Sequence, residues 1–196
     1  MMLWVIFGAF AILSWIVSSR LKSKFKKYSQ IPLPLSGAEI AARMLRDNGV
    51  NDVTIRPVDG TLTDFYNPAD KTVNLSSDVY ASRNVAAAAV AAHETGHALQ
   101  HAQGYKAMAL RTALVPLQNV SATILNVIFI GMFALAFIMP NLMPYTLALK
   151  IIIGCYAVFT LFSFVTLGVE IDASRRAVNW LTESGIIAAG ETRDGA

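Results

Sequence analysis

The sequence predicts a predominantly α-helical membrane protein, with three transmembrane helices and a small α+β cytoplasmic domain. Three observations support this prediction. First, 55% of the 196 residues are hydrophobic and only 15% are charged, which is more apolar than a typical soluble domain. Second, long uncharged segments flank a polar segment that is patterned like a folded domain. Third, that segment contains His93-Glu94-Thr95-Gly96-His97, a pattern typical of a metal-binding helix.

The first transmembrane helix is predicted at residues 1–19, which contain no charged side chain and are long enough to cross a hydrocarbon core. A cleaved signal peptide is the alternative, but it would carry positive charge before the apolar run. In this chain the positive charge follows, in a basic juxtamembrane linker at 20–35. Its basic residues are Arg20, Lys22, Lys24, Lys26 and Lys27. We therefore predict a retained anchor.

No residue between Arg111 and Lys150 is charged, and two more spans are predicted, at 120–139 and at 147–169, which ends at Glu170. The prolines and asparagine between them predict a short turn at 140–146. Basic residues lie outside the spans but not in this turn, apart from Lys150, which can snorkel outward. The positive-inside rule then places the N-terminus outside the cell membrane and residues 20–115 and 170–196 in the cytoplasm.

The basic cluster after the first span indicates contact with a lipid bilayer surface. Phe25 is the only aromatic residue between its basic side chains, which is fewer than a nucleic-acid stacking surface carries, so no nucleic-acid partner is predicted. Cys155 is the only cysteine and lies in a predicted span, which excludes an internal disulfide and favours a packing role.

The cytoplasmic segment at 36–116 begins with a predicted helix. Ser36 and Glu39 have the spacing of a capping box, an apolar stripe follows at helical spacing, and Gly49 is a plausible terminator. The stripe consists of Ile40, Ala41, Met44 and Leu45. We interpret it as core packing.

Short strands are predicted next, at 53–55, 62–66 and 72–75. The Asp59-Gly60 pair indicates a hairpin, so we expect a mostly antiparallel sheet. A strand beside a metal-binding helix could bind an extended peptide by edge pairing, or it could merely cover the core. The sequence leaves both alternatives open.

A helix is predicted from about residue 83 to 103, ended by Gly104. His93 and His97 are four residues apart and therefore share one face, with Glu94 beside them. Uncharged neighbours suit a helix that presents ligands from a protein interior. This pattern predicts Zn²⁺ with an open coordination position and Glu94 as general base.

A catalytic zinc site needs a third protein ligand. His101 lies about 12 Å from His93 along the helix axis, so one ion cannot bind both, and we interpret His101 as a surface or supporting residue. Glu170 ends the third span on the predicted side of the motif and is the better candidate. The alternative is an interfacial carboxylate paired with a nearby arginine.

Two residues near Glu170 could support the site. Ser174 lies one helical turn further and could hydrogen-bond a ligand. Asp172 points elsewhere on a helix, where it would pair with Arg176 or orient a histidine.

Three segments, HETGHALQH, EIDASRR and LTDFYNPADKTVNLS, resemble the YugP-like neutral zinc metallopeptidases of bacterial membranes. The resemblance covers essentially all of residues 1–196, and the chain is more distantly similar to the HtpX and CAAX-prenyl endopeptidases, which are gluzincins. It implies a zincin-like domain, zinc ligands at His93, His97 and Glu170, and Glu94 as catalytic base. Ser174 departs from the wider group, which carries aspartate there. The resemblance also implies a further hydrophobic segment beyond Ala196.

The predicted function is therefore hydrolysis of a peptide or protein substrate, with Glu94 accepting the proton of the attacking water. Arg175, Arg176 and Tyr105 are candidates for stabilising the oxyanion. The alternatives are an intramembrane metalloprotease and a zinc-binding scaffold or chaperone adaptor without turnover. A purely structural site would have no need of Glu94. The sequence does not predict the oligomeric state.

Overall fold

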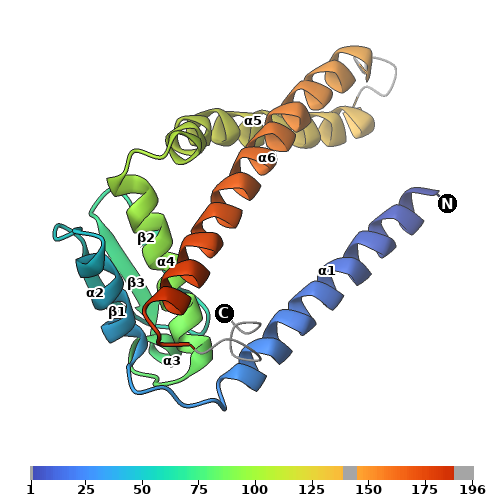
Figure 1. The fold of residues 1–196 in the computed structure, drawn as a ribbon. Helices are drawn as coiled ribbons and strands as arrows, with labels where there is room; N and C mark the ends of the chain where they lie inside the picture. The colour runs from blue at the N-terminus through green and yellow to red at the C-terminus, as the bar shows by residue number, and fades with distance from the viewer. Residues whose placement is uncertain (1, 139–144, 188–196) are drawn as a thin grey trace. The chain divides into compact units, whose positions relative to one another are not determined.

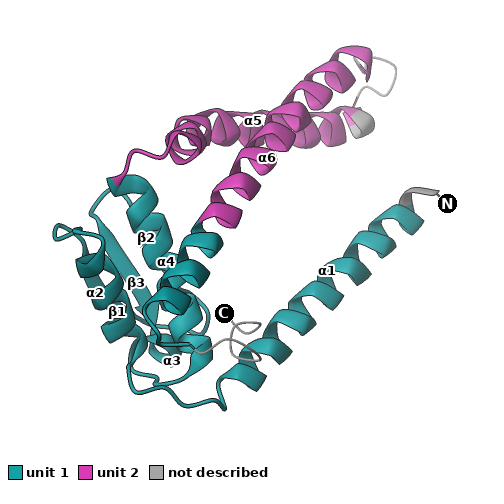
Figure 2. Ribbon diagram, viewed as in Figure 1, with its two compact units in different colours: residues 1–102, 173–196 teal, residues 103–172 magenta. Residues whose placement is uncertain are grey.

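The structure is a computed structural model that describes residues 2–138 and 145–187 (Figure 1). In chain order its elements are α1 (Met2–Tyr28), α2 (Gly37–Asp47), β1 (Thr54–Val58), β2 (Phe65–Asn67), β3 (Thr72–Ser76), α3 (Ser77–Tyr80), α4 (Val85–Ala102), α5 (Lys106–Ile138) and α6 (Tyr145–Glu183). They fall into two compact units, 1–102 with 173–196, and 103–172 (Figure 2). The helix α6 is continuous and contributes residues to both units.

Within the described residues, three helices are long and apolar enough to cross a membrane: Trp4–Tyr28, Lys106–Leu135 and Tyr145–Glu183. Each helix extends beyond the span predicted from sequence. α1 continues through the basic part of the predicted linker, and α5 begins well before residue 120. The predicted turn at 140–146 falls mostly outside the described residues.

The first unit has its core between α2, α4 and a three-stranded sheet (Figure 1). Ile40 and Met44 of α2 and Ala91 of α4 are fully buried in it. The Ser36 and Glu39 capping box forms as predicted, and Gly49 follows the helix with a φ of 70°. The predicted apolar stripe on α2 is therefore confirmed as a core-facing surface.

The sheet has the order β1-β3-β2. β3 pairs with β1 in parallel and with β2 antiparallel, so the predicted Asp59-Gly60 hairpin and mostly antiparallel sheet are wrong. β3 lies at the centre of the sheet, and all five of its residues are buried, as expected of a strand that is covered on both faces. The loop after β1 crosses the end of β3, where the Asp64 carboxylate accepts hydrogen bonds from the Ser76 N–H (2.7 Å) and hydroxyl (3.1 Å).

The linker before α2 is tied to the start of α4. Leu33 N–H donates to the Arg83 carbonyl at 3.0 Å, and Val85 N–H donates to the Ile31 carbonyl at 3.0 Å. Asn84 caps α4, because its side-chain oxygen accepts the Ala87 N–H at 2.9 Å. These bonds fix where α4 begins, and Gly104, with a φ of 63°, follows its end as predicted.

The second unit consists of α5 and the first part of α6. Most of their large apolar side chains are exposed, whereas Leu125, Ala148 and Cys155 are buried. Cys155 is a free thiol, in agreement with its predicted packing role. Exposed apolar surface on helices of this length is what a lipid environment would cover.

Candidate metal centre

The helix α4 presents His93, Glu94 and His97 from neighbouring turns. His97 is only 7% exposed, while His93 and Glu94 are partly buried. The two imidazole rings have their centroids 4.9 Å apart and meet edge to face at 84°. The prediction that both histidines share one helix face is therefore confirmed.

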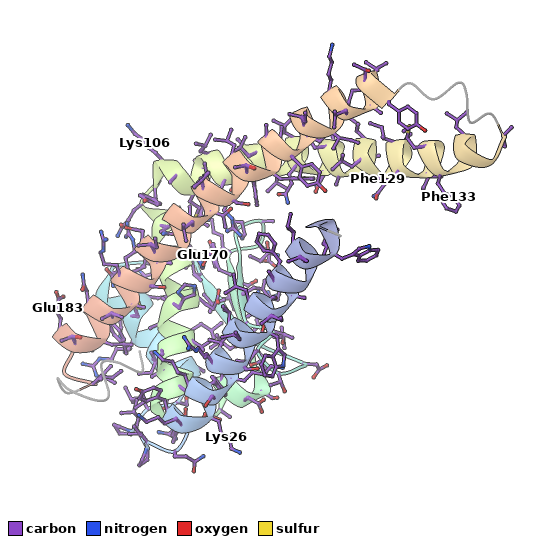
Figure 3. All side chains as sticks on the ribbon, turned by 90° about the vertical axis from the view of Figure 1, so that its right-hand side faces the viewer. Lys26, Lys106, Phe129, Phe133, Glu170 and Glu183 are labelled. Atoms are coloured by element: carbon purple, nitrogen blue, oxygen red, sulfur yellow. The ribbon has the colours of Figure 1, made fainter. Side chains whose placement is uncertain are left out.

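Glu170 lies on α6, where Figure 3 labels it. His93, His97 and Glu170 each offer a ligand atom, and these atoms all lie within 4.8 Å of one another. The structure thus brings together the three residues that the sequence nominated as zinc ligands. Their ligation of a metal stays a prediction.

Ser174 lies one turn beyond Glu170 on α6, and its hydroxyl is 3.1 Å from Nδ1 of His93. Such a bond orients the imidazole and leaves its Nε2 side for a metal ion. α6 can come this close because residue 96 is glycine. A Cβ built on Gly96 would lie 2.8 Å from the Ala173 carbonyl oxygen.

Gln100 is a site residue that the sequence reasoning missed. Its side-chain oxygen lies 3.0 Å from Nδ1 of His97, and the residue is completely buried. A glutamine three residues after His97 returns to the same side of the helix. The available signal was a polar amide three residues after His97 on a helix of mostly small and apolar residues, because a buried amide requires a partner.

Glu94 is connected to the sheet. Its Oε2 accepts a hydrogen bond from the Tyr66 N–H of β2 at 3.1 Å. The Tyr66 hydroxyl in turn lies 2.7 Å from Nδ1 of His101, further along α4. Burial, with smaller contributions from the carboxylates of Asp52 and Asp70, raises the pKa of Tyr66 to about 12. This hydroxyl therefore stays protonated at neutral pH.

The structure leaves the remaining candidates without an assigned role. His101 is exposed and is not in the three-residue group, as expected from its distance along the helix. Arg175 is exposed, whereas Tyr105, Arg176 and Asp172 are partly buried. Their contributions to an oxyanion site or to histidine orientation stay predictions.

The residues present fit a zinc ion. Two imidazoles and one carboxylate form the donor set of many catalytic zinc sites, with one position left for water or substrate. Nδ1 of each histidine has a polar neighbour, Ser174 for His93 and Gln100 for His97, so Nε2 is the ring atom that each would offer to a metal. The helix α4, which carries the motif, is not among the three apolar helices described above.

Comparisons with known proteins agree with this chemistry. A family model described as "putative neutral zinc metallopeptidase" matches residues 3–196. The "putative membrane protease YugP" of Bacillus subtilis (strain 168) is 40% identical over 181 residues, which cover 91% of this chain and 77% of that protein. No solved structure matches the chain significantly. Because the family model covers nearly the whole sequence, the chain belongs to this neutral zinc metallopeptidase family.

Proposed function

We propose that this chain is a membrane-anchored zinc metalloendopeptidase of the gluzincin type, with His93, His97 and Glu170 as zinc ligands. The observation that carries the proposal is the convergence of these three residues from α4 and α6, with ligand atoms within 4.8 Å of one another. Two histidines from one helix and a glutamate from a later helix form this type of site.

Glu94 is the general base of the proposed reaction. Bound zinc would acidify a water molecule and polarise the scissile carbonyl. Glu94 accepts the proton of the attacking water and delivers it to the leaving amine. Its carboxylate suits this role, because the Tyr66 N–H holds it at Oε2 and it sits beside both histidines.

An extended peptide is the proposed form of the substrate. β2 is an edge strand of the sheet and lies beside α4, since its Tyr66 N–H reaches Glu94. Edge strands bind extended peptides through main-chain hydrogen bonds. Glu94 already occupies the Tyr66 N–H, so in the proposed edge pairing the substrate would bond to other main-chain groups of β2.

The proposed location is the cell membrane, with the N-terminus outside and the site at the cytoplasmic face. Three long apolar helices support membrane insertion, and the basic residues after the first span support the orientation. The relative from Bacillus subtilis is described as a "putative membrane protease", in agreement with this location.

The test is zinc content and peptide hydrolysis of the purified full chain and three variants. Glu94→Gln should keep its zinc and lose at least about 100-fold in kcat, because it removes only the base. Glu170→Ala should lose zinc and activity together. Glu183→Ala, an exposed position on the same helix, is the matched control and should behave like the unmodified chain.

Two results would reject parts of this proposal. If Glu170→Ala binds zinc as tightly as the unmodified chain, the third ligand is wrong. If the zinc-loaded chain and Glu94→Gln are equally inert on a broad peptide library, the protein is a zinc-binding scaffold and not a peptidase.

A further inference from the structure

Tyr66 joins β2 to α4 at two points. Its main-chain N–H donates to Oε2 of Glu94 at 3.1 Å, and its hydroxyl lies 2.7 Å from Nδ1 of His101. Glu94 and His101 are seven residues apart, which is two turns of helix and about 10 Å along its axis. Both contacts therefore lie on one face of α4 and are made by a single residue of the sheet.

The first contact is made at the edge of the sheet. Tyr66 faces Val73 of β3 in the antiparallel register, and Phe65 and Asn67 face Asn74 and Thr72. Because the Tyr66 N–H bonds to α4, it serves as a donor from the edge strand to a side chain outside the sheet. A backbone donor has little freedom, so its position depends on how β2 lies along the helix.

The second contact can hold β2 in place. The Tyr66 ring is partly buried against the core, and its centroid lies 5.8 Å from that of the His101 ring. With its pKa raised to about 12, the Tyr66 hydroxyl remains an available donor at neutral pH. His101 lies too far along the helix to bind the same ion as His93, so a different role would explain its position.

We propose that Tyr66 and His101 are positioning residues, whose side-chain bond holds β2 along α4 so that the Tyr66 N–H fixes the Glu94 carboxylate. The inference rests on the proposed function, since it gives the orientation of the base in peptide hydrolysis. Neither side chain takes part in the reaction itself. Their bond sets the position of the Glu94 carboxylate, which is the proposed general base, and small displacements of a general base reduce turnover.

The first experiment compares kcat, KM and zinc content among variants of the full chain. Tyr66→Phe and His101→Ala each remove the bond and should each lower kcat about five- to tenfold, with zinc content unchanged. The double variant should lose no more than either single variant, because both changes delete one interaction. Tyr80→Phe, at another partly buried tyrosine of the same core, is the matched control and should leave kcat unchanged.

A rescue variant separates the hydrogen bond from the bulk of the side chain. Asparagine places a polar atom close to the position of histidine Nδ1, so His101→Asn should restore most of the kcat lost in His101→Ala. Two outcomes would overturn the inference: a His101→Ala enzyme with full kcat, or an asparagine variant as slow as alanine.

The second experiment needs no turnover. Hydrogen exchange of the Tyr66 amide in the full chain should be slow, and should accelerate in Glu94→Ala and His101→Ala but less in His101→Asn. Exchange that is equally fast in all four proteins would overturn the inference. If only the peptidase assignment fails, the chain shows no Glu94-dependent hydrolysis while this exchange pattern persists.

Discussion

The polar atoms behind the two histidine rings determine how well each ring can hold a metal ion. His97 has the Gln100 side-chain oxygen at its Nδ1, and His93 has the Ser174 hydroxyl. We expect Gln100→Met to weaken zinc binding about 10- to 100-fold, because the ring loses the partner that fixes its orientation. Competition with a chromophoric chelator would measure the change.

Gln103→Met is the matched control for this prediction, because Gln103 is exposed and lies one turn later in the chain. Its zinc affinity should equal that of the unmodified protein. Equal affinities for all three proteins would mean that Gln100 only fills space.

Gly96 has a role that its neighbours in the motif cannot replace. An added methyl group would meet the Ala173 carbonyl oxygen at 2.8 Å, so Gly96→Ala should push α6 from α4. Zinc content should fall, since Glu170 and Ser174 both lie on α6. Elemental analysis of the purified variant would measure its zinc content.

Gly168→Ala is the control, because a Cβ built on Gly168 would lie in open space. This variant should retain its zinc. A zinc-replete Gly96→Ala protein would show that the two helices can separate slightly without loss of the site.

At the scale of elements, α2 contains the clearest titratable contact. The Ser36 N–H donates to Glu39 Oε2 at 2.7 Å and lowers the pKa of Glu39 below its ordinary value of 4.5, and Arg83 lowers it further. Because the pKa of Glu39 is lower in the folded state than in the unfolded state, its ionised carboxylate stabilises the fold at pH values above the unfolded-state pKa. This stabilisation is lost as the pH falls through the folded-state pKa. Stability should therefore decline with acid below about pH 4.5.

Glu39→Gln keeps a side-chain oxygen for the capping box but cannot ionise. Its thermal unfolding midpoint should change less between neutral pH and about pH 3.5 than that of the unmodified chain. If the unfolding midpoints of the two proteins fall equally with acid, other carboxylates determine the acid sensitivity of the fold.

The elements also show what the sequence could and could not predict. The capping box at Ser36 and the pairing of His93 with His97 depend on residues within one or two turns, so their spacing was sufficient. The order of the strands depends on which strand is most buried, and the Asp59-Gly60 pair indicated a hairpin where the chain crosses the end of β3. The contact of Tyr66 with Glu94 follows from that order and could not be read from spacing.

At the scale of the whole molecule, the orientation in the membrane is the main open prediction. Cys155 is the only native cysteine, so a Cys155→Ser background permits single reporter cysteines. We expect an impermeant thiol reagent added to intact cells to label Asn141→Cys but not Asp78→Cys, because the first lies in the predicted outer turn and the second in the domain predicted to be cytoplasmic. The reverse labelling pattern would invert the topology.

The continuity of α6 has a consequence for the lipid around the protein. Its 39 residues form a rod of about 58 Å, roughly twice the hydrocarbon thickness of a bilayer, and Glu170 and Ser174 lie on it without an intervening loop. A change in the tilt of this rod therefore moves the carboxylate as well. If Glu170 binds zinc and α6 spans the bilayer as proposed, membrane thickness and zinc affinity are thermodynamically linked, and the linkage acts in both directions. Zinc titrations in bilayers of short-chain and long-chain phosphatidylcholine should give different zinc affinities. Equal affinities in the two bilayers would show that the tilt of α6 is not coupled to the site.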